Sequence, residues 1–284
     1  MKRKTYAYNE LRPVSKVAVY LLLYGGVLLF SFPLLWMILT SLKSLGEIHK
    51  IPMTWIPAKI QWSNYKQIFI DAPMGNYLWN STWYTCVTVF GTVLTSSLAA
   101  FAFARLRARG GTILFALVLS TMMIPSQVTL IPQYLIFNEL NWTDSYLPLV
   151  VPAFTASAFT IFLLRQFYMG ISRELDEAVK IDGGNRFVMY YRIMLPLSLP
   201  ALATAAVLEM MSRWNDLFGP LIYLNNGSKY PLSLGLANFT AAYGATPWQL
   251  LMAASVVAVL PLLILFFMAQ KYFIQGIVTS GSKG

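Results

Sequence analysis

Six long apolar runs follow one another along the chain, and shorter segments that carry most of the charged residues separate them. A helix needs about 20 apolar residues to cross the hydrocarbon core of a bilayer. We expect transmembrane helices at residues 17–42, 79–103, 112–131, 147–168, 197–218 and 248–272. The pattern predicts an all-α membrane protein in which residues 1–284 form a single transmembrane domain with six membrane-spanning helices.

The longest polar interruption, residues 172–196, separates the fourth run from the fifth. Its first part has the spacing of a short amphipathic helix over residues 173–181. Gly183 and Gly184 then permit a tight turn, and a second short helix is expected from Arg186 to Leu195. A plain connector is the alternative, but helical periodicity and mixed charge over this length favour a structured surface.

A fixed motif lies within this interruption. Glutamate, alanine, glycine, isoleucine, leucine and proline stand at Glu177, Ala178, Gly183, Ile193, Leu195 and Pro196. This spacing resembles the EAA loop of binding-protein-dependent ABC importer permeases, in which Glu-Ala-Ala precedes a glycine and an Ile-x-Leu-Pro end. Val179 replaces the second alanine of that pattern and keeps the position apolar.

Two further stretches are similar to the maltose-type, carbohydrate-uptake branch of these permeases: residues 212–224, with Trp-Asn-Asp, and residues 270–284. The resemblance implies a permease with six membrane helices and a cytoplasmic coupling loop between the fourth and the fifth. It implies four partners: a second homologous permease, a dimer of cytoplasmic ATPases, an extracytoplasmic solute-binding protein and a sugar substrate. In this branch the cargo is mostly an oligosaccharide, and sometimes glycerol phosphate or a polyol.

The same resemblance assigns the ATPase contact to one part of the loop: Glu177, Ala178, Val179, Asp182, Gly183 and Gly184. Glu177 and Asp182 are expected to pair with basic groups of the ATPase, while Ala178 and Gly183 permit close approach. The chain contains no Gly-x-x-x-x-Gly-Lys-Ser/Thr sequence, so we expect ATP and Mg²⁺ to be bound by the partner ATPase. The chain itself is expected to be no enzyme and to need no cofactor.

The basic residues predict the orientation. Lysine and arginine beside the runs are distributed about three to one in favour of the amino-terminal side, which places both termini and residues 172–196 in the cytoplasm. The net charge of +10 accompanies 57% hydrophobic residues and a mean hydropathy of +0.58. These values favour a multi-pass membrane protein over a nucleic-acid-binding protein. The resemblance implies that this membrane is the inner membrane of a prokaryotic cell.

The fifth run contains three charged residues, Glu209, Arg213 and Asp216. Their spacing places them near one helical stripe, and the cost of ionised groups in lipid predicts that this stripe faces the protein interior. We expect Glu209 and Arg213 to form an intramembrane pair that fixes packing. Asn215 and Asp216 are expected to line the translocation path, with Trp214 beside them meeting hydrated cargo.

Other functions remain open from the residues alone. A secondary transporter of a small polar solute is the main alternative, although no inverted repeat is visible. A membrane enzyme would need convergent acid, base or metal ligands, and the single histidine, His49, and single cysteine, Cys86, predict no metal site. Residues 43–75 carry several prolines and tryptophans, which is typical of a structured cap at the membrane interface.

Overall fold

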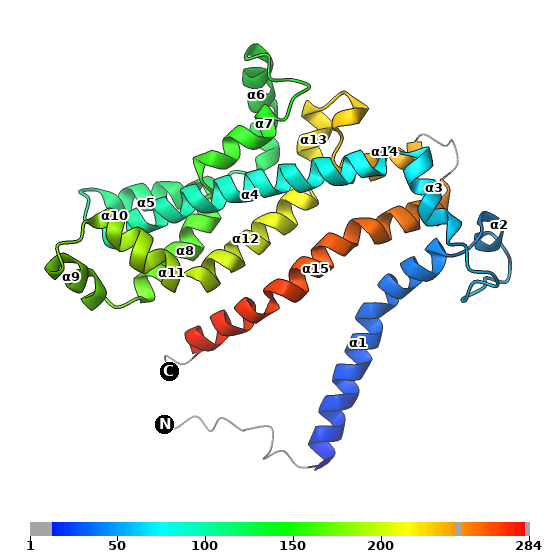
Figure 1. The fold of residues 1–284 in the computed structure, drawn as a ribbon, viewed down its shortest axis with the longest axis horizontal. Coiled ribbons are helices and arrows are strands. Elements are labelled where there is room, and N and C mark those ends of the chain that lie inside the picture. Colours follow the sequence, from blue (N-terminus) through cyan, green and yellow to red (C-terminus); the bar gives the residue numbers. More distant parts are fainter. Residues whose placement is uncertain (1–12, 242–245, 282–284) are drawn as a thin grey trace. The chain divides into compact units, whose positions relative to one another are not determined.

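The computed structural model describes residues 13–241 and 246–281, and these residues form helices and connecting turns (Figure 1). The chain divides into two compact units. The first comprises Met1–Asp71 with Tyr243–Val257, and the second comprises Ala72–Ala242 with Ala258–Gly284. The last helix, α15 (Trp248–Gly281), contains residues of both units.

Residues 13–71 of the first unit contain one long helix and two short ones. Helix α1 (Pro13–Ser41) includes the first predicted span, and α2 (Leu45–Ile48) and α3 (Ser63–Asp71) follow it. Side-chain hydrogen bonds end α1, because the Asn64 amide donates to the carbonyl oxygens of Ser41 and Lys43. The expected cap over residues 43–75 is therefore an ordered segment with two short helices.

The second unit is built around α4 (Met74–Arg105). The elements that pack most extensively against it are η3 (Val151–Thr155), α8 (Ala158–Gly170), α12 (Leu199–Trp214) and α14 (Leu232–Ala241). Small residues allow this close packing, since a Cβ atom at Gly91 would lie 2.7 Å from the Phe154 ring. Gly91, Ser96 and Ser97 are all buried at these helix contacts.

Two predicted spans are interrupted. The run at residues 112–131 forms α5 (Gly111–Ser120), η2 (Thr121–Met123) and α6 (Ser126–Glu139), with a 95° bend before Ser126. Pro125 caps α6 in extended geometry, because a proline cannot continue the ladder of the preceding helix. The predicted span over 112–131 is therefore a bent pair of helices and not one continuous helix.

The run at residues 197–218 is also not one helix. Helix α12 ends at Trp214, and a 75° bend separates it from Arg186–Leu197, which contains α10 (Arg186–Val188), the π-helical turn η4 (Met189–Met194) and α11 (Leu195–Leu197). Asp216 therefore lies beyond the end of α12. Of the three charged residues of this run, Glu209 and Arg213 lie on one face of α12. Helix α13 (Phe218–Tyr223) begins the next segment.

Four helical stretches in the described part of the chain are long and apolar enough to cross a membrane: Lys16–Ser41, Met74–Arg105, Leu147–Gly170 and Trp248–Gln270. The third stretch includes α7 (Leu147–Val150), η3 and α8. The number rises to six if each bent pair counts as one span.

Candidate functional site

The polar segment between α8 and α12 begins with α9 (Glu174–Ile181), which matches the predicted first helix. A Schellman turn ends it, because the Gly183 N–H donates to the Lys180 carbonyl at 3.1 Å and the Gly184 N–H donates to the Val179 carbonyl at 2.8 Å. Gly183 has a φ of +75°, which a side chain disfavours. A Cβ atom on Gly184 would lie 2.6 Å from Val179 Cγ1, so the second glycine is a requirement of close packing.

The six residues predicted to contact an ATPase divide into two groups. Glu177, Ala178, Asp182 and Gly183 are exposed. Val179 and Gly184 are partly buried and pack against each other, and Val179 also contacts the hydrophobic core below α9. The first group is available to a partner, whereas the second group shapes the end of the helix.

Exposed apolar side chains extend this surface beyond the residues that the motif identified. Ile181 is 85% exposed, Phe187 80% and Tyr191 73%. Within the described residues, no side chain hydrogen-bonds the carboxylate of Glu177 or of Asp182. The result is an open surface that combines apolar groups with unpaired acids, which is the composition of a protein contact site.

A buried ion pair attaches α9 to the helical bundle. Arg105 Nη1 donates to Asp176 Oδ2 at 3.1 Å, and the two side chains are only 2% and 14% exposed. Arg105 Nη2 donates to the carbonyl oxygens of Tyr168 and Ile171 at 2.8 and 2.7 Å, at the carboxyl end of α8. One guanidinium therefore joins the ends of α4 and α8 to the helix of the polar segment.

A second polar link lies one layer below. The Ser97 hydroxyl on α4 is 2.6 Å from the Tyr168 hydroxyl on α8 and 2.9 Å from the Tyr190 hydroxyl on η4. Ser97 and Tyr168 are fully buried, and Tyr190 also packs its ring against Phe101. These contacts hold the segment after Gly184 against the same two helices, so the whole loop is fixed to the bundle.

The intramembrane charges lie on α12 and just beyond it. Arg213 Nε is 3.8 Å from Glu209 Oε2, which is ion-pair distance but longer than a hydrogen bond. Glu209 Oε1 accepts a hydrogen bond from the Thr160 hydroxyl at 3.0 Å. The arrangement places the predicted pair on one face of α12 and connects it to α8.

The residues predicted for the translocation path have different surroundings. Asp216 accepts hydrogen bonds from the Tyr84 hydroxyl and the Gly219 N–H, each at 3.1 Å, so its carboxylate already joins α4 to α13. Asn215 is exposed, and its amide donates to the Met211 carbonyl at 2.7 Å. Trp214, which was expected beside them, is 5% exposed, and its indole N–H donates to the Ala258 carbonyl at 3.1 Å.

Comparison with known proteins decides the family. The model of the family described as "Binding-protein-dependent transport system inner membrane component" matches residues 91–279, which include the polar segment 172–196 and α12. The chain belongs to this family. It is therefore a permease subunit of an ABC importer.

Individual relatives agree. The permease is 34% identical over 256 residues to the arabinooligosaccharides transport system permease protein AraQ of Halalkalibacterium halodurans, covering 89% of this chain and 91% of the relative. It is 30% identical over 275 residues to the sulfoquinovosyl glycerol transport system permease protein SmoH of Agrobacterium fabrum. This match covers 96% of this chain and 94% of SmoH. A chain in the crystal structure of a bacterial ABC transporter involved in the import of the acidic polysaccharide alginate has the same fold. The TM-score is 0.80 and the sequence identity is 24%, and the match covers 95% of this permease and 100% of that chain.

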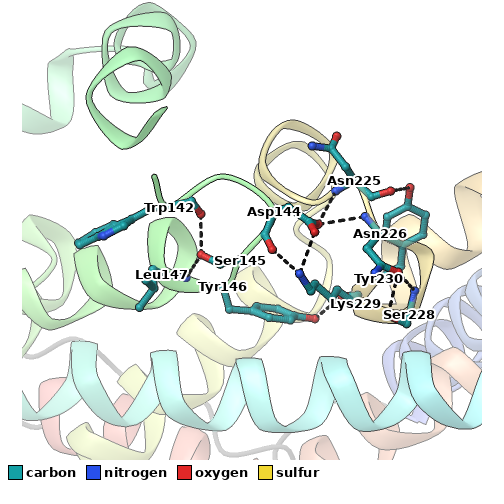
Figure 2. Close-up of polar contacts among 10 residues, drawn as sticks. All are labelled: Trp142, Asp144, Ser145, Tyr146, Leu147, Asn225, Asn226, Ser228, Lys229 and Tyr230. Atoms are coloured by element: carbon teal, nitrogen blue, oxygen red, sulfur yellow. Dashed lines mark hydrogen bonds and ion pairs between the residues drawn. The ribbon is translucent and has the colours of Figure 1, made fainter. Parts of the chain in front are cut away.

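The permease carries another polar cluster near the opposite end of α4 (Figure 2). Asp144 Oδ1 accepts hydrogen bonds from the backbone N–H groups of Asn225 and Asn226, each at 3.0 Å, and its Oδ2 lies 2.8 Å from Lys229 Nζ. The hydrogen bond from Lys229 and those two N–H groups lower the pKa of Asp144 to about 2. The Tyr146 hydroxyl donates to the Lys229 carbonyl at 2.6 Å, so two loops distant in sequence form one structure.

Helix α4 separates this cluster from the polar segment at residues 172–196. Near its start, the Asn80 amide donates to the carbonyl oxygens of Ser228 and Tyr230, and at its end Arg105 binds Asp176. At 1.5 Å per residue, Asn80 and Arg105 are about 37 Å apart along the axis, which is close to the thickness of a bilayer. In the sequence, Arg105 and Lys229 are two of the basic residues that lie beside the apolar runs, and their pairing with Asp176 and Asp144 was not predicted.

Proposed function

We propose that this permease translocates a carbohydrate in the oligosaccharide range, which an extracytoplasmic solute-binding protein delivers. The names of its relatives support this cargo class, since AraQ belongs to an arabinooligosaccharide system and SmoH to a sulfoquinovosyl glycerol system. A second permease and a dimer of cytoplasmic ATPases complete the importer, and the ATPases bind ATP and Mg²⁺. The permease itself performs no chemical reaction in this scheme.

The observation that carries the proposal is the attachment of α9. Glu177 on α9, Asp182 at its end and Phe187 on α10 are exposed and available to a partner, while the Arg105–Asp176 pair fixes the inward side of α9 to the ends of α4 and α8. A helix that is open on one side and rigidly attached on the other transmits the closure of an ATPase dimer to the membrane helices as a rigid-body movement. Residues 172–196 therefore form the coupling loop.

The proposed topology has six spans within one transmembrane domain, with each bent pair crossing the membrane once. Both termini and the coupling loop lie in the cytoplasm of a prokaryotic cell, and the Asp144–Lys229 cluster lies outside. The length of α4 between its two polar ends and the excess of basic residues on one side support this arrangement. Within the membrane, exposed Asn215 is the better candidate for cargo contact, and Asp216 supports the local structure.

Reconstitution tests the proposal. The four-component importer in liposomes should accumulate a labelled arabinooligosaccharide or sulfoquinovosyl glycerol only when ATP is present on the ATPase side. Phe187→Asp should abolish ATPase copurification and uptake, whereas Phe218→Asp, at a comparably exposed phenylalanine on α13, should retain the ATPase. Uptake by the permease pair without ATPase would overturn the coupling role, and uptake of neither compound with intact ATPase stimulation would overturn only the cargo class.

A further inference from the structure

The loop between α1 and α3 exposes an unusual number of apolar side chains. Six of them are well exposed: Ile51 at 94%, Met53 at 54%, Trp55 at 60%, Ile56 at 74%, Ile60 at 52% and Trp62 at 68%. Scattered apolar residues are common on protein surfaces, but a continuous group within twelve residues of a loop marks an interaction site. We call residues 51–62 the apolar loop.

The apolar loop has a fixed shape that keeps these side chains outside. The Lys43 ammonium is 2% exposed and donates to the Thr54 carbonyl from beneath the loop. Glu47 Oε1 accepts a hydrogen bond from the Ala58 N–H at 2.7 Å, and the Gln61 N–H donates to the Leu42 carbonyl at 2.9 Å. These contacts hold the backbone of the loop at three positions, Thr54, Ala58 and Gln61.

The loop folds back along α1. The Trp55 ring lies 5.6 Å from the Trp36 ring and 6.3 Å from the Phe32 ring, measured between centroids. At a rise of 1.5 Å per residue, Trp36 lies about 8 Å before the end of α1 at Ser41, and Phe32 lies about 13 Å before that end. Because Lys16–Ser41 is long and apolar enough to cross a membrane, Trp55 reaches a depth at which the neighbouring helix is a membrane span.

We infer that the apolar loop inserts into the phospholipid interface at the carboxyl end of α1. Tryptophan prefers this boundary, and Trp36 and Trp55 are in contact there. Lys50 and Lys59 are exposed at the two ends of the most apolar part, where ammonium groups reach the phosphates of lipid headgroups. The loop then acts as an interfacial anchor that fixes the depth and tilt of α1.

The charge and the continuity of the surface favour lipid over a protein partner. The exposed apolar group continues directly from the apolar side chains of α1, and its flanking charges are basic, which matches anionic phospholipid. A protein that covered this surface would instead shield the loop from both lipid and water. The two cases give different results in one experiment.

Spin labels measure the environment of the loop in the assembled importer. Single cysteines replace Ile51, Ile56 or Ser228 in a Cys86→Ala permease, and the labelled complex is placed in nanodiscs of phosphatidylcholine with phosphatidylglycerol. Labels at 51 and 56 should be relaxed several-fold more by oxygen than by a water-soluble nickel chelate, and the label at exposed Ser228 should show the reverse. Nickel access at 51 and 56 equal to that at 228, or shielding from both reagents, would overturn the inference.

The lysines are tested in the same assay. The double variant Lys50→Gln/Lys59→Gln should move the label at Ile56 toward water in discs that contain phosphatidylglycerol, and should have little effect in pure phosphatidylcholine. Lys66→Gln, at an exposed lysine on α3 outside the apolar loop, is the matched control. An unchanged oxygen-to-nickel ratio in the double variant would overturn the assignment of these lysines to headgroup phosphates.

Discussion

The Arg105 guanidinium on α4 and the Asp176 carboxylate on the coupling helix form an ion pair at 3.1 Å that is almost fully buried. The pair lies at the position where movement of an ATPase would pass from α9 into the membrane helices. Arg105 also binds the last carbonyl oxygens of α8, so it contacts two bundle helices and the coupling helix at once. Its removal is therefore expected to affect stability and coupling together.

Asp176→Ala should destabilise the permease, because it leaves the Arg105 charge buried without its partner. Loss of one member of a buried pair costs about 3 kcal/mol. Thermal unfolding of the purified complex should detect this loss, and uptake should fall while the ATPases still hydrolyse ATP. Glu174→Ala on the same helix is the control, since Glu174 is exposed; equal melting temperatures for both variants would contradict the proposed anchor.

Gly184→Ala should impair coupling because its new methyl group would meet Val179. Adding Val179→Ala, which restores the second alanine of the family motif, should recover part of the uptake. Recovery should be incomplete, because the Val179 carbonyl also lies 2.9 Å from the new Cβ atom. Gly183→Ala provides the comparison. An alanine at a φ of +75° destabilises the turn by about 1 kcal/mol, and adding Val179→Ala should not restore the uptake that this variant loses.

Glu177→Lys should weaken ATPase copurification by at least tenfold, since it reverses an exposed charge on the coupling surface. The permease should still insert and melt as the wild type does, because Glu177 has no side-chain hydrogen bond within the described residues. Glu139→Lys reverses an exposed charge at the end of α6 and should retain the ATPase. Normal copurification of the Glu177 variant would show that the loop is only a connector.

Arg213→Ala should lower the amount of intact complex extracted in mild detergent, because Glu209 would keep only the Thr160 hydroxyl as its partner. Asp216→Ala should also destabilise, by about 1 to 3 kcal/mol, because the Tyr84 hydroxyl and the Gly219 N–H lose their hydrogen bonds to the Asp216 carboxylate. Asn215→Ala should instead reduce uptake with little change in assembly. Full assembly and full transport in Arg213→Ala would contradict the structural role of the pair.

The Asp144–Lys229 cluster should be insensitive to pH over the physiological range. A carboxylate whose pKa is lowered to about 2 stabilises the folded loops above its ordinary pKa, and this contribution is lost as pH falls from about 4 to 2. Asp144→Ala at pH 7 should accelerate hydrogen exchange of the Asn225 and Asn226 amides, which donate to Asp144. Glu139→Ala should leave both amides protected, and unchanged exchange in Asp144→Ala would contradict the link between the two loops.

The sequence by itself determined the features that depend on neighbouring residues. Apolar run lengths predicted the long helices α1, α4 and α15, and spacing predicted α9 together with the turn at Gly183 and Gly184. The fixed motif between Glu177 and Pro196 indicated the family, which the matching family model confirms. Helical periodicity, turns and motifs are local properties, so no tertiary contact is needed to recognise them.

Tertiary structure decided which residues are buried and which partners they have. Arg105 follows an apolar run and has the pattern of a topology signal, yet it binds Asp176, which is 71 residues away in the chain. Trp214 was expected at hydrated cargo, yet its indole N–H donates to a carbonyl of α15. Burial and pairing arise when distant segments pack together, and the energy of a charged or polar side chain depends on that packing rather than on its neighbours in sequence.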